Sequence, residues 1–215
     1  MIIATWNMQG ASHSTENKWN SGVLNLLSSG AQICCLQECG DKPRSAVLRQ
    51  QNYCGIPGLN LYTWGTERYP KWILFYPADS KGNRCNLAIA SNAAPTEGFL
   101  VAPAVQPICR PTIGMTLDGT VFFTLHAISP GGPDAPALVN AAFGAGGSVI
   151  VAGDYNRAPG TMGGGAQVVC PPNGPTYPST RPESYYDYVI KNFGDATTGT
   201  VLSLQLSDHL PVQFD

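Results

Sequence analysis

Two polar residues at positions 154 and 156 follow a short apolar segment, and together they could act on a phosphate. Residues 149–152 read Val-Ile-Val-Ala and predict a buried strand, because the segment is short, apolar and β-branched. Asp154 and Asn156 are two positions apart, so on an extended backbone their side chains face the same way. They could hold one phosphate, one water or one metal ion. The alternative is a simple turn, since Gly, Asp and Asn are common turn residues.

Polar side chains recur at the ends of other predicted strands, and one more carboxylate lies within a strand. These residues are Asn7, Glu38, His126, Asp208 and His209 at strand ends, and Asp187 within the strand at 185–190. Function in sheet-based folds gathers where strand ends and their loops converge. Metal-assisted phosphodiester hydrolysis needs these groups, because Mg²⁺ prefers oxygen ligands and a histidine can move the proton of water. Taken singly, each motif also reads as an ordinary turn or loop.

Short strands and a few helices must position these groups. Strands are predicted at 2–7, 33–36, 72–76, 87–91, 112–117, 121–126, 149–152, 185–190 and 211–214, with Asp118-Gly119 as a hairpin turn. Helices are predicted at 17–28 and 134–143, and a further one is expected to begin within 41–49. Residues 10–17 and 50–70 are expected to be irregular, and residues 159–182 to form a long surface loop.

The composition favours a single domain, 1–215, built from many short strands. The chain has 215 residues with 43% hydrophobic and only 12% charged residues, together with 24 glycines and 18 prolines. The net charge of −2 means that any contact with nucleic acid must come from a local basic patch. The sequence has no apolar run of bilayer length and no recognisable signal peptide, so we expect no membrane insertion.

The seven cysteines do not form a zinc-binding pattern, because none is part of a Cys-x-x-Cys pair. Cys34 and Cys35 lie in an apolar run and are expected to be buried thiols. The other five lie in loop-like contexts where disulfides could form: Cys39, Cys54, Cys85, Cys109 and Cys170. Cysteine usage leaves the cellular compartment open.

The polar motifs and their order along the chain resemble those of the endonuclease/exonuclease/phosphatase superfamily. This superfamily has the fold of pancreatic-type deoxyribonuclease I. The motifs are Thr5-Trp6-Asn7, Gln37-Glu38, Gly153-Asp154-x-Asn156, Asp187 within Tyr-Asp-Tyr, and Ser207-Asp208-His209-x-Pro211. The resemblance implies an α/β fold, a four-layered α/β sandwich of two packed mixed β-sheets flanked by helices.

A closer resemblance, to the catalytic B subunits of cytolethal distending toxins, covers essentially the whole chain. It rests on residues 6–10 and 14–20, Pro43 to Val47, Arg84 to Ile89, Arg110-Pro111 and residues 131–135. It implies a Mg²⁺-dependent endonuclease, with Ca²⁺ or Mn²⁺ as alternative ions, that hydrolyses DNA phosphodiester bonds. Such a genotoxin subunit would cause DNA damage and cell-cycle arrest.

The resemblance also implies a role for each residue around the metal ion. Glu38 is the expected main metal ligand, with Asp208 beside it and Asn7 near the ion. Asp154 and Asn156 are expected to position the attacking water and the phosphate.

The remaining implied roles concern proton transfer and phosphate binding. His126 and His209 are the expected acid–base pair, and which of them is the acid stays open. Asp187 is expected to orient one of them through a hydrogen bond. Arg84 and Arg110 are expected to bind phosphate, as bidentate donors do, although each could also be an ordinary surface charge.

Two departures from the superfamily pattern bear on these roles. The nuclease pattern has a second Glu that pairs with the first catalytic His, and the aligned position here is Pro70, with Glu67 out of register. The partner of His126 is therefore in question. The chain is also shorter than typical toxin subunits, with the shortfall placed near 159–182.

Two alternatives to a nuclease stay open at this point. The same metal and water chemistry would serve a phosphatase of phosphoinositide lipids such as PIP3, for which lipid phosphate is the substrate. A decayed, non-enzymatic binding module is disfavoured because every core polar position carries a competent residue. The resemblance further implies a secreted toxin that acts in the host-cell nucleus on DNA, together with delivery subunits.

Overall fold

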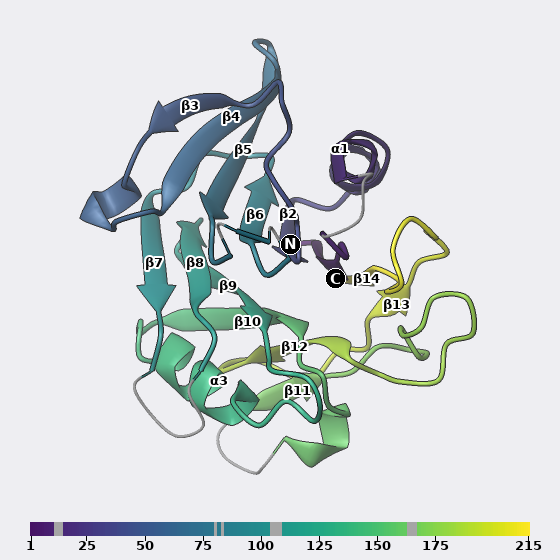
Figure 1. The fold of residues 1–215 in the computed structure, drawn as a ribbon. Helices are drawn as coiled ribbons and strands as arrows, with labels where there is room; N and C mark the ends of the chain where they lie inside the picture. The colour runs from purple at the N-terminus through teal and green to yellow at the C-terminus, as the bar shows by residue number, and fades with distance from the viewer. Residues whose placement is uncertain (11–14, 80, 83, 104–108, 163–166) are drawn as a thin grey trace.

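Two mixed β-sheets pack against each other in the computed structural model, and helical segments cover their outer faces (Figure 1). The structure describes residues 1–10, 15–79, 81–82, 84–103, 109–162 and 167–215. The predicted four-layered sandwich of two mixed sheets is confirmed, although its helical layers are thin.

The first sheet has eight strands in the order β13-β14-β1-β2-β6-β5-β4-β3. Their bounds are β1 Ile3–Asn7, β2 Ile33–Gln37, β3 Val47–Gln50, β4 Asn60–Thr66, β5 Tyr69–Tyr76, β6 Leu87–Ser91, β13 Thr200–Val201 and β14 Val212–Phe214. The second sheet has six strands in the order β11-β12-β10-β9-β8-β7. Their bounds are β7 Glu97–Val101, β8 Thr112–Leu117, β9 Thr120–His126, β10 Ser148–Asp154, β11 Val168–Cys170 and β12 Asp187–Lys191.

The helical layers are short. One continuous helical segment combines α1 (Thr15–Asn17), the π-helical turn η1 (Lys18–Val23) and α2 (Leu24–Ser28), and helix α3 spans Ala135–Phe143. The buried side chains of the first segment pack on the outer face of the first sheet; they include Trp19, Val23, Leu26 and Leu27, in one cluster with Trp6, Cys34 and Leu36. Figure 1 shows α3 on the face of the second sheet that points away from the first sheet. Two 3₁₀ turns complete the elements, η2 (Tyr53–Gly55) and η3 (Pro159–Thr161).

Alternation along the central strands separates the two faces of the first sheet. On β1, Ala4 and Trp6 pack under the helical segment, whereas Ile3 belongs to the core that includes both sheets. Between the sheets, Gln37 Nε2 donates to Thr124 Oγ1 at 2.8 Å and joins β2 to β9. The inner faces are therefore fixed against each other directly below the ends of β2 and β9.

Two parallel strand pairs bring the polar strand ends to one edge of the sandwich. β1 and β2 are parallel with Asn7 opposite Gln37, and β9 and β10 are parallel with His126 opposite Asp154. β12 runs antiparallel to β10, which places Asp187 opposite Asp154. Because parallel strands end at the same edge, residues far apart in sequence converge there.

Most predicted elements are present, and three predictions are wrong. The predicted helix beginning within 41–49 is absent; these residues form turns and the edge strand β3 instead. The predicted irregular stretch 50–70 contains β4, and the loop predicted at 159–182 contains η3 and β11. The loop predicted at 10–17 lies partly outside the described residues, and its end, Thr15–Asn17, is helical.

All seven cysteines are free thiols in this structure. Cys39 and Cys170, expected in loop-like contexts, are buried, as are Cys34 and Cys35. Among the described residues, no helix is both long and apolar enough to cross a membrane.

Candidate active site

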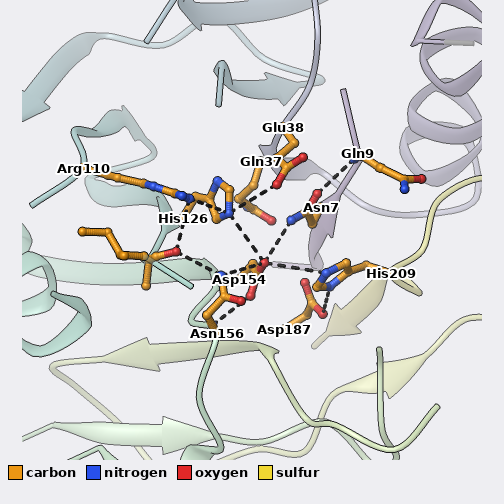
Figure 2. Close-up of polar contacts among 12 residues, drawn as sticks. Asn7, Gln9, Gln37, Glu38, Arg110, His126, Asp154, Asn156, Asp187 and His209 are labelled. Atoms are coloured by element: carbon orange, nitrogen blue, oxygen red, sulfur yellow. Dashed lines mark hydrogen bonds and ion pairs between the residues drawn. The ribbon is translucent and has the colours of Figure 1, made fainter. Parts of the chain in front are cut away.

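A cavity of about 720 Å³ opens at the edge where the strand ends converge. Nine of the ten residues singled out in the sequence line it: Asn7, Glu38, Arg84, Arg110, His126, Asp154, Asn156, Asp208 and His209. The tenth, Asp187, lies directly behind His209 and is fully buried. Figure 2 shows most of these side chains pointing toward one another from the two sheets. The structure therefore brings all ten together.

Three lining residues adopt a left-handed backbone within two residues of a strand end. Gln9 follows β1 with φ 49°, Glu38 follows β2 with φ 45°, and Asn156 follows β10 with φ 50°. Non-glycine residues rarely adopt this conformation, and such strain gathers at functional sites. The sharp turns place the three residues in the cavity wall just beyond the strand ends.

Asp154 is the central acceptor of the site. Asn7 Nδ2 donates to Asp154 Oδ2 at 2.9 Å, and the backbone N–H of Asn156 donates to Asp154 Oδ1 at 2.8 Å. The Asn156 amide also donates to the carbonyl of Ala127 at 3.0 Å, so β9 and β10 are tied together at their ends. The pKa of Asp154 is raised to about 7, mainly by burial. The nearby His209 lowers this pKa, and the negative charge of Asp187 raises it.

His209 is held between two buried carboxylates. Its Nδ1 lies 2.8 Å from Asp187 Oδ2, and its Nε2 lies 3.7 Å from Asp154 Oδ2. Burial alone lowers the pKa of His209, but Asp187, with Asp154 and Asp208, overrides this effect and raises the pKa to about 9. The bond to Asp187 fixes the proton on Nδ1 and leaves Nε2 facing the site. The predicted orienting contact of Asp187 is thus present, and its histidine is His209.

His126 has the opposite environment. Its Nε2 lies 2.8 Å from Arg110 Nη1, 3.5 Å from Glu38 Oε1 and 3.8 Å from Asp154 Oδ2. A guanidinium can only donate, so Nε2 accepts this bond and the ring is neutral. Burial and the charge of Arg110 lower the pKa of His126 well below its usual value. The two histidines therefore differ in charge, although both face Asp154.

The sequence left the partner of His126 in question, with Pro70 at the aligned position. Pro70 pairs with Gly65 near the start of β5, whereas β5 approaches the site edge at its other end, where Tyr76 pairs with Leu87. Among the described residues, the buried Nδ1 of His126 has no hydrogen-bond partner. Position 70 therefore says nothing about how His126 is oriented.

The oxygen donors that line the cavity fit a hard divalent cation. Burial raises the pKa of Glu38, and the negative charge of Asp208 raises it further. The charge of Arg84 and a hydrogen bond from Asn7 act in the opposite direction and lower this pKa. Two carboxylates that repel each other at a cavity wall gain from a cation between them. Asn7 Oδ1 accepts one bond, from the N–H of Gln9 at 3.0 Å, and a carbonyl oxygen has a second lone pair.

A buried lysine lies behind this donor set. Lys18 is only 2% exposed, and its Nζ donates to the carbonyl of Met8 at 2.6 Å. Burial lowers the pKa of Lys18, while Asp208 and Glu38 oppose that change. The ammonium group therefore holds the turn after β1, which carries Asn7 and Gln9 to the cavity.

A second group of donors also has metal-like spacing. One ligand atom from each of Asp154, Asp187 and His209 lies within 4.8 Å of the others. The 2.8 Å bond between Asp187 and His209 already engages both side chains, and all three residues are buried. A hydrogen-bonded cluster for proton transfer fits these contacts better than a cation site does.

The sequence did not indicate five further residues that line the cavity: Gln9, Cys85, Ser129, Tyr177 and Tyr186. Gln9, Cys85 and Tyr186 are close in sequence to predicted site residues. Tyr177 comes from the Gly- and Pro-rich segment, where no periodicity predicts a position. It packs on His209 with ring centroids 4.6 Å apart, a contact that only the tertiary structure could reveal.

Comparisons with known proteins define the class of the chain. A family model described as Endonuclease/Exonuclease/phosphatase family matches residues 4–209. The chain therefore belongs to the endonuclease/exonuclease/phosphatase family.

Within this family, the chain is similar to the B subunits of cytolethal distending toxins. It is 38% identical over 174 residues to a homolog of this toxin subunit from Salmonella typhi. It is 36% identical over 177 residues to the corresponding cytolethal distending toxin subunit of Escherichia coli. These matches cover 73% and 74% of this chain and 64% and 65% of the relatives, so the chain spans just under two thirds of their length.

A solved structure shows the same likeness. The fold superposes on the Haemophilus ducreyi cytolethal distending toxin with a TM-score of 0.85 and 31% sequence identity. The match covers 99% of this chain and 96% of the other chain. The resemblance to the toxin B subunits seen in the sequence is confirmed.

Proposed function

We propose that the chain is a Mg²⁺-dependent endonuclease that hydrolyses DNA phosphodiester bonds and acts as the catalytic subunit of a genotoxin. One observation carries this proposal: the Nε2 atoms of His126 and His209 face the same oxygen, Asp154 Oδ2, at 3.8 and 3.7 Å. Two imidazoles and a carboxylate around one point can bind a phosphate and move a proton to or from it. Membership of the family and similarity to the toxin subunits support the same reaction class.

Each side chain has a role that its contacts support. Asp154 accepts the proton of the attacking water, in an orientation set by Asn7 and Asn156. His209, oriented by Asp187, presents Nε2 to the reacting phosphate as the proton donor. His126 stays neutral and orients Arg110 by accepting its N–H, and the remaining N–H groups of Arg110 bind the phosphate oxygens.

Glu38, Asp208 and Asn7 would hold the Mg²⁺ ion in this proposal, and Mn²⁺ or Ca²⁺ would use the same oxygen donors. When bound, the ion supplies Lewis-acid stabilisation of charge on the phosphate. Arg84 lines the same cavity and adds a second guanidinium for phosphate binding.

The biological setting in the proposal comes from the relatives. We place the chain as a secreted toxin that acts on DNA in the host-cell nucleus, delivered by other toxin subunits. The names of the relatives describe one subunit of a toxin, which supports a multi-subunit assembly.

The test compares relaxation of supercoiled plasmid in Mg²⁺ and in EDTA for the wild type, His209→Ala and the control Asp118→Asn, which changes a turn residue between β8 and β9. We expect Mg²⁺-dependent nicking by the wild type and the control, and loss of nicking in His209→Ala. Phosphate release from a soluble phosphatidylinositol trisphosphate runs in parallel. Phosphate release without nicking would replace the nuclease with a lipid phosphatase, and silence in both assays would favour a binding module.

A further inference from the structure

A second cavity adjoins the active-site cavity. Its volume is about 500 Å³, within the usual range for small-molecule sites. It shares Asn156 and Tyr186 with the active-site cavity. The rest of its wall consists of Gly131, Arg157, Ala158, Thr161, Glu183, Ser184 and Tyr185. A substrate that enters the active site can therefore extend past Tyr186 into this space.

A row of aromatic rings leads from the reacting centre toward the second cavity. Tyr177 packs on His209 with ring centroids 4.6 Å apart, and Tyr177 stacks on Tyr186 at 5.8 Å with an interplanar angle of 23°. Tyr186 is the ring that both cavities share, and Tyr185 beyond it is 41% exposed. The row thus starts beside a catalytic histidine and continues into the neighbouring cavity.

The backbone fixes the position of this row. The carbonyl of Tyr186 accepts the N–H of Tyr155 at 2.9 Å, and the N–H of Tyr186 donates to Thr176 Oγ1 at 3.2 Å. An antiparallel bridge pairs Tyr177 with Ser184. Because both rings are held before substrate arrives, little conformational entropy is lost when a flat group stacks on them.

Among the described residues, the second cavity has one cation in its wall, Arg157, and the N–H groups of that residue are partly engaged. The guanidinium of Arg157 already donates to the backbone carbonyl of Thr161 at 2.6 Å, to its Oγ1 at 3.0 Å and to the carbonyl of Gly132 at 3.4 Å. The other charged residue in the wall is the carboxylate of Glu183. The phosphate-binding cations Arg84 and Arg110 line the first cavity and not this one. The two cavities therefore differ in chemistry: the first has two arginines for phosphate, whereas most of the second wall is neutral and includes two tyrosines that can contact a flat group.

We propose that the second cavity is a nucleobase subsite: it takes an unstacked base from a nucleotide next to the scissile phosphate, with Tyr186 as the stacking platform. This inference rests on the proposed nuclease function. Every nucleobase presents a π-face, so aromatic stacking binds bases with little sequence preference. An inositol polyphosphate offers no such face and carries phosphates around its ring, which this wall does not match. The subsite therefore selects nucleic acid over a phosphoinositide headgroup and favours strands whose bases are free to unstack.

The test uses a dinucleotide, which offers one phosphate to the active site, and analogues in which an abasic tetrahydrofuran residue replaces one nucleoside at a time, so that the phosphate stays constant. Binding is measured by fluorescence anisotropy in EDTA, which needs no cleavage. For the wild type, we expect loss of the base that enters the subsite to weaken binding about tenfold. Tyr186→Ala is expected to bind the intact dinucleotide as weakly as the wild type binds the abasic analogue, with no further loss when the base is removed. Tyr186→Phe keeps the ring and is expected to behave like the wild type.

Tyr69→Ala, which removes a 63% exposed tyrosine on the other sheet, is the matched control and should change nothing. The inference fails if the intact dinucleotide and both abasic analogues bind the wild type equally. It also fails if Tyr186→Ala weakens the intact and abasic forms by the same factor, or if a soluble inositol phosphate loses affinity in Tyr186→Ala. The separate plasmid assay tests the nuclease activity, whereas the binding assay tests the base subsite. Either proposal can therefore fail while the other is supported.

Discussion

Asp154 and Asp187 are register partners on neighbouring antiparallel strands, and both carboxylates are buried. Two buried carboxylates this close repel each other unless a cation or a proton lies nearby. His209 supplies that charge, with Nδ1 at 2.8 Å from Asp187 and Nε2 at 3.7 Å from Asp154. The three residues therefore form one electrostatic unit, in which a change in one alters the protonation of the others.

Asp187→Asn is expected to lower the pKa of His209 from about 9 toward its ordinary value, because Asp187 is the main group that raises it. Nicking should fall by about 10²–10⁴-fold at neutral pH, the usual contribution of an acid–base group. The measurements are NMR titration of the His209 ring in metal-free protein and plasmid relaxation in Mg²⁺. Asp118→Asn, on the exposed hairpin turn, is the control, and an unchanged His209 pKa in Asp187→Asn would contradict the assignment.

The same contact predicts how stability changes with pH. The folded-state pKa of His209 is raised, so the stabilisation from its charge is fully present below the unfolded value of about 6.5 and is lost as pH rises through about 9. We expect the thermal midpoint of the wild type to fall between about pH 6.5 and pH 9.5. Asp187→Asn should show a smaller fall. Equal falls in both proteins would mean that another group causes the pH dependence.

Arg110→Ala is expected to raise the pKa of His126, since the charge of Arg110 is, after burial, the main cause of its lowering. It also removes a phosphate donor from the cavity, and we expect kcat/KM for nicking to fall about 10–100-fold. Arg110→Lys should restore only part of the activity, because a lysine cannot form the bidentate contact. Arg68→Ala changes an arginine that packs on the exposed Tyr69 and serves as the control. Full activity in Arg110→Ala would rule out a role in the site.

The strand ends that build the site could be predicted from the sequence, because a short apolar run ends where polar residues begin. Asn7, Glu38, His126 and Asp154 are all found this way, and parallel pairing then brings them to one edge. The aromatic row could not be predicted. Tyr177 lies in a segment without periodicity, and its position depends on packing against His209 from the end of the chain.

The errors in the fold prediction have equally local causes. The basic residues at 41–49 suggested a helix, but Val47–Gln50 forms the exposed edge strand β3, whose hydrogen bonds come from its neighbour β4. In β4 itself, residues 61–64 are buried in succession on both faces of the sheet, so the alternation that indicates a strand is missing. Pairing partners, which a local pattern does not contain, decide both segments.

Glu38→Gln is expected to weaken metal binding while the fold stays intact, because the amide keeps the shape of the carboxylate and loses its charge. With fewer charged oxygen ligands, the Mg²⁺ concentration needed for half-maximal nicking should rise at least about tenfold. Binding of Mn²⁺, followed by electron paramagnetic resonance, gives a readout that does not depend on activity. The matched control is Glu97→Gln, at the start of the edge strand β7. Unchanged Mn²⁺ affinity in Glu38→Gln would place the metal site elsewhere.

Gly153→Ala tests the close approach of β9 and β10 just below the site. A Cβ atom at position 153 would collide with the backbone carbonyl oxygen of Leu125, which belongs to the paired strand and has no room to move. Ordinary overpacking costs about 1–3 kcal/mol, and we expect this backbone collision to reach or exceed about 3 kcal/mol in urea unfolding. It should also reduce nicking, since His126 and Asp154 are the next residues on the two strands. Gly160→Ala, where an added Cβ meets nothing within 4 Å, should leave the free energy of unfolding nearly unchanged. Equal stability of the two variants would show that β9 and β10 can separate at this point.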